Sequence, residues 1–443
     1  MAEIKRIKIG DVCRLEKGIT GLASAIPGDY PLVATSAERK TSKTYQFNEK
    51  AICIPLVSST GHGKRSLNYV HYQEGKFALG SILVAVIPKD DKVLSARYLH
   101  VYLQKNKDRV LVPLMKGAAN VSLSVKAIAD IEIPLPSIQQ QQAILDKIDS
   151  ISGEHRDFLD ELDIQANLFG KLRQAVLQEA IEGKLTAGWR KQNPKLISGE
   201  NHASELLEKI KAGKERLIKE GKIKRDKPLL PIAEDEKPFV LPEGWAWCRL
   251  GEVVQVKGGK RVANGYKLLK IPTPHIYIRV SDMKNGTVDD SDLHYIDEGM
   301  YQQIKQYTIS KDDLYMTIVG ATIGKCGIVP SKFDNMNLTE NAAKIIIFIL
   351  NKIFFLNCLN SSFCQEQFID KTKQVGVQKM ALNRFTTTII PFPPLAEQQA
   401  IVERVEKIMA MIDELEKQVT ERKNQSEKLM QSVLREAFAE GVK

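Results

Sequence analysis

Residues 133–144 read IPLPSIQQQQAI, and residues 390–401 read IPFPPLAEQQAI. The two stretches open a direct repeat without gaps, in which 16 of the 50 positions of 133–182 are identical in 390–439. About three identities would be expected by chance at average residue frequencies. A repeat on this scale organises the rest of the 443-residue chain, because each copy is expected to fold in the same way.

Each copy of the repeat predicts one long helix. Prolines lie just before it, and a glycine, Gly183 or Gly441, lies at its end, where these residues are favoured. Apolar residues follow the heptad pattern of a coiled coil, and in the second copy they occupy positions 401, 405, 408, 412, 415 and 419. About 45 residues would form a rod of roughly 65 Å. We expect the two rods to pair; the alternative is that each packs only on its neighbouring domain.

Two segments that mix strand-like and helical patterns lie outside the rods. The predicted fold class is therefore α+β, with two mixed α/β domains separated by two long antiparallel coiled-coil helices in a pseudo-twofold internal repeat. The expected boundaries are a domain at 1–132, a helix at 133–185, a linker at 186–240, a domain at 241–388 and a helix at 389–443.

The two mixed segments share little sequence beyond their edges, where Ile9–Val12 is similar to Leu250–Val253. This pattern indicates duplicated helices and domains that have diverged. The linker holds one amphipathic helix, for which Ser204 is the expected N-cap.

The net charge of +10 is unevenly distributed. Residues 1–132 hold 20 Lys and Arg against 12 Asp and Glu, and residues 241–388 hold 18 against 14. The rods are acidic, with 5 against 9 in 133–185 and 8 against 10 in 389–443. A polyanion would be attracted to the domains rather than to the rods. The alternative is a solvated surface that has no partner.

Two basic, glycine-spaced loops are candidates for contact with phosphate. Gly320–Lys325 looks like a nucleotide-binding loop but is one residue short, and Cys326 stands where Ser or Thr would bind magnesium. We interpret it as a tight loop between two strands, with backbone N–H groups and Lys325 available to a DNA phosphate. Ser59–Arg65 is a looser counterpart in the first domain.

Charge and loop position nominate a wider set of DNA-contacting residues, and for each one a solvated surface position is an equally good interpretation. They are Arg39, Lys40, Lys43, Thr60, Lys64, Arg65, Lys260, Arg261, Arg279, Thr322, Lys325, Lys379 and Arg384.

Motifs for catalysis and for metal binding are not found in the sequence. The proline clusters at 134–136 and 391–394 lack the preceding Asn of an amino-methyltransferase. Six cysteines form no CxxC pair and seven histidines form no HxxxH or HxH, so no metal site is expected. A self-contained DNA nuclease or methyltransferase, and a coiled-coil scaffold that binds only protein, are kept as alternatives to a DNA-recognition chain.

The proline and glutamine motifs resemble those of the specificity subunits of type I restriction-modification systems. The residues are Ile133–Pro136 with Gln140–Ile144, and Ile390–Leu395 with Glu397–Ile401; Gln140 replaces the family's usual Glu. Leu241–Trp247 is similar to the family's entry into a recognition domain, and Val319–Lys325 to a loop within it. The resemblance covers essentially the whole chain in the family's order of domain, helix, domain and helix.

The resemblance implies a chain without catalytic activity, metal or cofactor of its own. It implies two modification subunits that methylate adenine with S-adenosylmethionine, and two restriction subunits that use ATP, with Mg also in the partners. The DNA target would be a double-stranded, asymmetric, bipartite site, with one half read by each domain and a spacer set by the rods. Gln141, Gln142, Glu397, Gln398 and Gln399 are the expected docking residues for partner subunits, unless they pack the helix starts against the preceding domains.

The expected location is the cytoplasm, without membrane contact. The N-terminus lacks the apolar core of a signal peptide, and the longest apolar stretch, Ile345–Leu356, is too short to span a bilayer.

Overall fold

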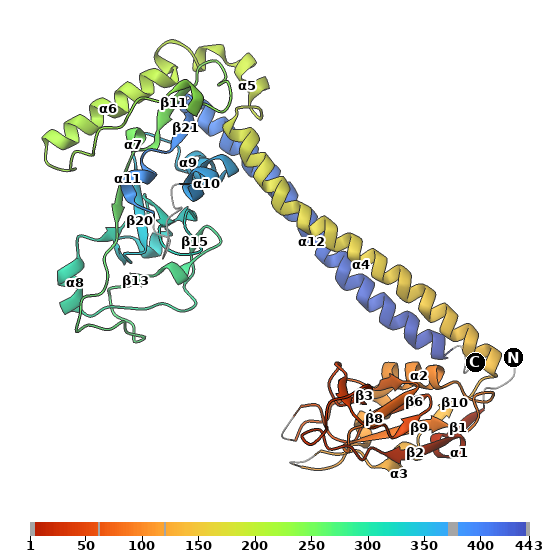
Figure 1. Cartoon of the computed structure of the whole chain (residues 1–443). Helices are drawn as coiled ribbons and strands as arrows, with labels where there is room; N and C mark the ends of the chain where they lie inside the picture. Colours follow the sequence, from red (N-terminus) through yellow and green to blue (C-terminus); the bar gives the residue numbers. More distant parts are fainter. Residues whose placement is uncertain (1–4, 61–62, 119–120, 371–379, 440–443) are drawn as a thin grey trace. The chain divides into compact units, whose positions relative to one another are not determined.

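The computed structural model describes residues 5–60, 63–118, 121–370 and 380–439 (Figure 1). The chain forms two compact units, each described by itself. Unit 1 comprises Met1–Ile164 with Val419–Lys443, and unit 2 comprises Gln165–Gln418. Each unit contains one mixed α/β domain and parts of both long helices, α4 (Ile138–Ile181) and α12 (Leu395–Ala439), which confirms the predicted α+β class.

The first domain runs from β1 (Arg6–Lys8) to β10 (Glu132–Pro134), two strands that pair antiparallel at its base. Its larger sheet is antiparallel, with the order β2-β9-β6-β7, and its smaller sheet has the order β4-β3-β8-β5. The bounds are α1 Ile9–Val12, β2 Cys13–Lys17, β3 Tyr30–Val33, β4 Lys40–Ser42, β5 Phe47–Asn48, β6 Ala51–Pro55, β7 His71–Gln73, β8 Lys76–Leu79, β9 Leu83–Pro88, α2 Ala96–Val110 and α3 Val125–Ala129.

The second domain runs from β11 (Ala246–Arg249) to β21 (Ile389–Phe392), which again pair antiparallel. Its sheets have the orders β12-β20-β17-β18 and β13-β19-β16, with a separate β14-β15 hairpin. The bounds are α7 Leu250–Val253, β12 Val254–Gly258, β13 Tyr277–Ile278, β14 Met283–Lys284, β15 Thr287–Val288, α8 Glu298–Ile304, β16 Thr308–Ile309, β17 Leu314–Thr317, β18 Cys326–Ile328, β19 Met336–Leu338, β20 Ala342–Ile347, α9 Lys352–Asn360, α10 Ser362–Asp370 and α11 Leu382–Phe385.

The two domains share one topology. In each larger sheet the first strand in the chain (β2 or β12) pairs with the last (β9 or β20). That last strand also pairs with the first of two consecutive antiparallel strands, β6 and β7 or β17 and β18. In each smaller sheet a parallel pair, β3 with β8 or β13 with β19, is followed by an antiparallel neighbour, β5 or β16. Hence the domains diverged in sequence while keeping their strand order, because topology depends on where apolar runs and turns fall rather than on individual residues.

Two pairs of glycines mark the positions where this shared topology leaves no space for a side chain. A Cβ on Gly18 would overlap the carbonyl oxygens of Leu79 and Gly80, and one on Gly259 would overlap those of Leu338 and Thr339. Gly10 packs on Ala129 in the same way that Gly251 packs on Thr386. Close backbone approach therefore requires glycine at the end of the first sheet strand in both domains.

Each domain has its core between the larger sheet and the helices that follow it. In the first domain, Ile54 and Val86 of the sheet pack with Leu99 of α2, and the same core includes Leu145 and Ile148 of α4. Figure 1 shows α2 along the sheet of this domain. In the second domain, sheet residues such as Met316 and Ile345 pack with Phe355 and Leu359 of α9, together with Ile181 at the end of α4.

The long helices pair antiparallel within both units. In unit 1, Lys423 Nζ lies 2.9 Å from Asp163 Oδ1. In unit 2, Arg173 Nη2 lies 2.6 Å from Asp413 Oδ1 and 2.7 Å from Glu416 Oε2. In unit 1, Met430, later on α12 than Lys423, packs on the core that includes Leu145 and Ile148, which precede Asp163 on α4. In unit 2, Thr186, just after α4, donates to Glu397 near the start of α12. Within each unit the two helices therefore run in opposite directions. The predicted pairing of the rods is confirmed within each unit.

The heptad seam is only partly covered by this pairing. Ile401, Val405 and Ile412 are buried as the pattern predicts, but Leu415 is 47% exposed. On α4, Phe158 and Leu172 are likewise 41% and 43% exposed although they occupy seam positions. A two-helix pair covers only one side of each helix, so large apolar side chains stay on its surface.

The segment 186–240 packs onto the second domain. Its helices are α5 (Ala187–Gln192) and α6 (Ala203–Lys219), and α6 adds Ala203, Leu206 and Ile210 to the core of that domain. The expectation of Ser204 as N-cap is wrong by two positions, because His202 Nδ1 accepts the Ser204 N–H at 3.1 Å and caps α6.

Candidate nucleic-acid interface

In the first domain, the nominated residue Arg39 forms hydrogen bonds through all three of its guanidinium nitrogens. Its Nε donates to Gln73 Oε1 at 3.1 Å, its Nη1 to His71 Nδ1 at 3.2 Å and to Ala37 O at 3.4 Å, and its Nη2 to Tyr72 O at 3.2 Å. Lys40 and Lys43, on and just after β4, are exposed nearby in sequence. The structure therefore groups three nominated cations around β4.

The loop after β6 is closed by its own hydrogen bonds. Ser58 Oγ donates to Lys64 O at 2.5 Å, and the Asn68 N–H donates to Ser59 Oγ at 2.9 Å. Thr60 Oγ1 lies 2.8 Å from Ser66 Oγ, so its hydroxyl is used inside the loop. Lys64 and Arg65 are exposed, and the described part of the chain shows no ion pair for either. Two cations therefore project from a braced loop.

The loop Gly320–Lys325 joins β17 to β18, as the sequence predicts. Three of its six backbone N–H groups are used within the hairpin: Ile323 N donates to Gly320 O, Gly324 N to Thr317 O and Lys325 N to Thr322 O. Thr317 Oγ1 also donates to Thr322 O. These three N–H groups are therefore not available to a phosphate, and the expectation stays a prediction for those of Gly320, Ala321 and Thr322. The exposed Lys325 side chain is what the loop offers.

Two of the three nominated arginines of the second domain are neutralised by carboxylates. Arg261 Nε lies 2.7 Å from Glu340 Oε1. Arg279 Nη2 lies 2.5 Å from Asp282 Oδ1 and 3.2 Å from Asp292 Oδ2. Both arginines line one hollow of about 620 Å³. The ion pairs cancel most of the positive charge that the sequence assigned to this hollow.

The remaining nominated residues are scattered. The Nζ of Lys260 lies 5.7 Å from the centre of the Tyr307 ring, in a cation–π contact. Arg384 is exposed on α11, and Thr322 is partly buried in its hairpin. Lys379 lies outside the described residues.

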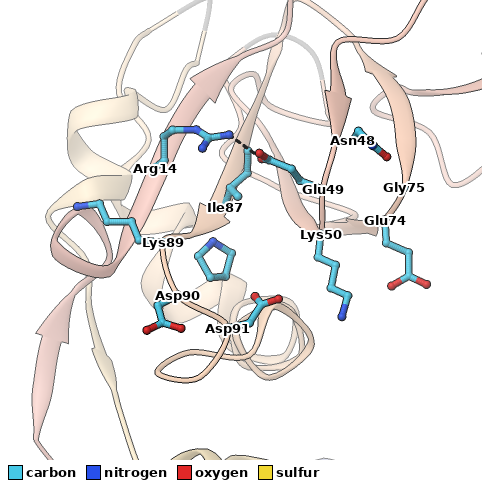
Figure 2. A pocket seen from close by; sticks show the side chains of 11 residues that line it. Arg14, Asn48, Glu49, Lys50, Glu74, Gly75, Ile87, Lys89, Asp90 and Asp91 are labelled. Atoms are coloured by element: carbon cyan, nitrogen blue, oxygen red, sulfur yellow. Dashed lines mark hydrogen bonds and ion pairs between the residues drawn. The ribbon is translucent and has the colours of Figure 1, made fainter.

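A hollow of the first domain beside β2 and β9 is a poor site for a polyanion. It has a volume of about 1040 Å³, and its lining includes Glu49, Glu74, Asp90 and Asp91. Figure 2 shows Arg14 directed at Glu49, with which it forms an ion pair at 2.6 Å. Lys89 Nζ donates to the carbonyls of Gly10 and Asp11. The four carboxylates outnumber the three lining cations, Arg14, Lys50 and Lys89, and two of these cations are engaged, so this hollow is not assigned to DNA.

The glutamines that open the long helices hold the domains to those helices. Gln141 is fully buried; its Oε1 accepts the Ser95 N–H at 2.8 Å, and its Nε2 donates to Val93 O and Pro136 O, both at 2.9 Å. Ser95 is the N-cap of α2. The expected docking residue is thus occupied within the chain, in agreement with the packing alternative.

The second copy repeats this contact. Gln398 is fully buried, accepts the N–H of Asn351 at 3.0 Å and donates to Pro393 O at 3.0 Å. Asn351 is the N-cap of α9. In both domains one buried amide therefore joins the helix start to the N-terminus of a domain helix.

Glu397 is also buried and has an entirely internal set of partners. It accepts from Thr186 Oγ1 at 2.6 Å, from Arg190 Nη1 at 2.5 Å and from Trp245 Nε1 at 2.7 Å. Gln142 and Gln399, by contrast, are exposed on the helix surface. Among the five expected docking residues, these two alone are accessible.

Some residues of these arrangements were missed by sequence reasoning. His71, Gln73 and Arg190 belong to no motif, and Trp245 belongs to the motif Leu241–Trp247, which does not indicate its bond to Glu397; the roles of all four arise from neighbours distant in sequence. The alternation of His71 and Gln73 in a short strand is the only signal that could have placed them on one face.

The chain is thus built from two copies of one module, an α/β domain followed by a long helix. A family model described as the type I restriction modification DNA specificity domain matches residues 1–161 and 242–423, which is more than half of the chain. The chain belongs to this family.

Curated relatives agree with this assignment. The chain is 29% identical over 282 residues to the type I restriction enzyme EcoAI specificity subunit of Escherichia coli, covering 59% of this chain and 43% of that protein. It is 27% identical over 327 residues to the EcoBI specificity subunit of the same species, covering 71% of this chain and 59% of that protein. The chain thus spans only about half the length of these two relatives.

Solved structures support the fold. One, from work on complex assembly and conformational transition of the type I R-M system, has a TM-score of 0.62 at 14% identity and covers 99% of this chain and 98% of that chain. The HsdS subunit from Thermoanaerobacter tengcongensis has a TM-score of 0.50 at 15% identity, covering 98% and 96%.

Two searches of the described residues concern metals and membranes. No cluster of three or more His, Cys, Asp or Glu side chains in the described ranges is placed to bind a metal ion. Within the same part of the chain, no helix combines the length and the apolar character needed to cross a bilayer.

Proposed function

We propose that this chain is the DNA sequence-specificity subunit of a type I restriction-modification complex and has no catalytic role. Each domain would read one half of an asymmetric, bipartite, double-stranded target. The observation that carries the proposal is the pair of domains with one topology but different exposed side chains, since such a pair suits two unlike half-sites. Membership of the specificity family supports the same conclusion.

Partner subunits would dock on the long helices. Among the described residues of these helices, eight large apolar side chains are exposed, namely Phe158, Ile164, Leu168, Leu172, Leu395, Met411, Leu415 and Leu429. In unit 1 a hollow of about 520 Å³ between the helices is lined by residues such as Ile151, Phe158 and Met430. Apolar surface of this kind marks a protein contact. We propose two modification and two restriction subunits as partners, which would supply S-adenosylmethionine, ATP and Mg chemistry.

The test of the proposed function begins in the host genome. Methylated adenines would be mapped with and without this gene, and we expect one bipartite motif to lose methylation in its absence. The assembled complex should bind a duplex with that motif and lose binding when either half is scrambled. Methyl transfer or cleavage by the purified chain alone would contradict a non-catalytic subunit, and binding that ignores the DNA sequence would favour a protein-only scaffold.

Lys325→Ala tests one contact of the second domain. Lys325 is an exposed cation in the loop that joins β17 to β18. Its removal should weaken DNA binding by the complex. Because one phosphate contact is lost, the log–log slope of affinity against salt concentration should also fall in magnitude by about 0.9. Lys311→Ala, another exposed lysine of the same domain, is the control. An unchanged slope for Lys325→Ala would remove Lys325 from the phosphate contacts.

A further inference from the structure

Arg39 is held by neutral groups alone. Its four hydrogen-bond acceptors are the side chains of His71 and Gln73 and the backbone carbonyls of Ala37 and Tyr72. None of these acceptors carries a negative charge, and the described residues include no ion-pair partner for Arg39. The guanidinium is therefore fixed in position while keeping its full positive charge.

Three of the four acceptors come from one strand, β7. His71 and Gln73 are two residues apart on β7, so their side chains share a face, and the carbonyl of Tyr72 lies between them. β7 is held by β6, where Cys53 pairs with His71. The Tyr69 ring also stacks on the His71 imidazole at 5.8 Å between centres. The three acceptors on β7 are thus part of the larger sheet, and the Tyr69 ring packs against one of them, His71.

His71 must act as an acceptor toward Arg39. An arginine only donates, so His71 Nδ1 has to present its lone pair, which requires an uncharged ring. His71 is 5% exposed, and its burial, together with the nearby charge of Arg39, lowers its pKa to about 4. The imidazole consequently stays neutral at physiological pH and does not compete with Arg39 for an anion.

The number of free donors indicates what Arg39 can bind. Its guanidinium has five N–H groups, and the contacts above use four of them. Reading guanine requires two N–H groups side by side. One free N–H with an uncompensated charge suits a single phosphate oxygen instead.

We propose that Arg39 is a fixed contact to one phosphate of the DNA backbone, with His71 and Gln73 as its positioning residues. This inference rests on the proposed function and deepens it, because it gives the first domain a built phosphate site. Arg261 and Arg279, paired with carboxylates, have no equivalent role. The first domain would then grip the backbone through a pre-positioned arginine that keeps its charge.

The experiment uses the full chain assembled with its modification subunits and a duplex carrying the mapped methylation motif. Binding is measured over a series of salt concentrations for the unsubstituted chain, Arg39→Gln, Arg39→Met and a control, Lys126→Ala, which removes an exposed lysine of α3. We expect both Arg39 variants to lower the magnitude of the log–log salt slope by about 0.9, as for one lost phosphate contact. The control should leave the slope unchanged.

The positioning role is tested by a double-mutant cycle with His71→Phe, which keeps a ring against Tyr69 but removes the acceptor. This substitution should weaken binding severalfold when Arg39 is present and have no further effect in the Arg39→Gln chain. Equal effects in both backgrounds would mean that His71 acts only on stability.

The outcomes separate this inference from the proposed function. If the unsubstituted complex does not distinguish the motif from a scrambled duplex, the proposed function fails. If it does, and both Arg39 variants keep the original slope, the phosphate assignment alone is overturned. Loss of discrimination at one base pair with an unchanged slope would overturn it in favour of base reading.

Discussion

The first and second domains share their strand order but differ in how their exposed arginines are balanced. Arg39, which follows β3, is held by neutral acceptors, whereas Arg279, which follows the corresponding strand β13, is paired with Asp282 and Asp292. The contacts that fasten each domain to its helix are instead the same, through Gln141 and Gln398. Duplication has therefore retained the contacts that position each domain, while the partners that balance these arginines have changed.

The helix starts differ in one informative respect. Gln140 in the first copy caps α4, accepting the Ser137 N–H at 2.9 Å on the protein surface. Its counterpart in the second copy follows Pro394, which has no hydroxyl, and that counterpart, Glu397, turns inward to Arg190 and Trp245. One repeat position thus serves as a surface cap in unit 1 and as a buried ion pair in unit 2.

Glu397→Gln should have the largest effect, and it should be confined to unit 2. The substitution leaves Arg190, whose side chain is 13% exposed, without its counter-charge. We expect the free energy of unfolding to fall by about 3–5 kcal/mol, as for other broken buried ion pairs. All three tryptophans of the chain (189, 245 and 247) lie in unit 2, so urea unfolding followed by tryptophan fluorescence reports on this unit alone.

Gln140→Ala is the matched control for this prediction. It removes only an exposed cap and should lower the free energy of unfolding of unit 1 by about 1 kcal/mol or less, followed by far-UV circular dichroism because unit 1 has no tryptophan. A double variant with Arg190→Met and Glu397→Gln should recover part of the lost stability, because neither charge is then left alone. If Glu397→Gln costs no more than the control, the buried network does not stabilise unit 2.

Gln141→Leu and Gln398→Leu should have smaller and mutually equal effects. Each substitution leaves two buried groups, the N–H of an N-cap residue and a proline carbonyl, without a hydrogen bond. The free energy of unfolding should fall by about 2–3 kcal/mol as a result. Hydrogen exchange measured by mass spectrometry should show faster exchange in α2 for the first variant and in α9 for the second. The control substitutions Gln142→Ala and Gln399→Ala lie one residue further along, on the exposed face of each helix. They should change the free energy of unfolding by no more than about 0.5 kcal/mol. Clearly unequal costs would show that the repeated contact is not equivalent in the two domains.

Much of the fold could be predicted because it depends on pattern. Heptad spacing and flanking prolines identified both long helices, and mixed strand-like and helical patterns identified the two α/β domains. The common strand order of the two domains was not predictable in this way, because Leu32 or Ile278 can be replaced by any apolar residue without changing the pairing. Repeat detection relies on identity, and few identities remain in the domains.

The candidate interface was predicted less well for a physical reason. Charge in a sequence does not indicate which cations are already neutralised, and Arg261, Arg279 and Arg39 look alike until Glu340, Asp292 and His71 are placed beside them. The same holds for the helix starts, where Gln141 and Gln142 are adjacent in sequence but only the first turns inward. A helical period of 3.6 residues separates neighbours onto different faces, and the domain contact decides which face is buried.

Acidification should weaken unit 1 through His71. Burial lowers the pKa of His71 from 6.5 to about 4, with Arg39 and His100 acting in the same direction. The unfolded chain therefore binds a proton that the folded domain does not between these two values, so stability is complete above about pH 6.5 and falls as the pH drops toward 4. Between pH 7 and pH 5 the loss should be about 2 kcal/mol.

His71→Gln separates this effect from general acid destabilisation. Glutamine can offer Arg39 an oxygen acceptor but does not titrate, so the pH dependence between 7 and 5 should be flatter by about 2 kcal/mol in that variant. Far-UV circular dichroism follows both units, whereas tryptophan fluorescence follows unit 2, so the difference should appear only in the dichroism. An identical pH dependence in both chains would mean that His71 is protonated in the folded domain, and a protonated ring could not accept from Arg39.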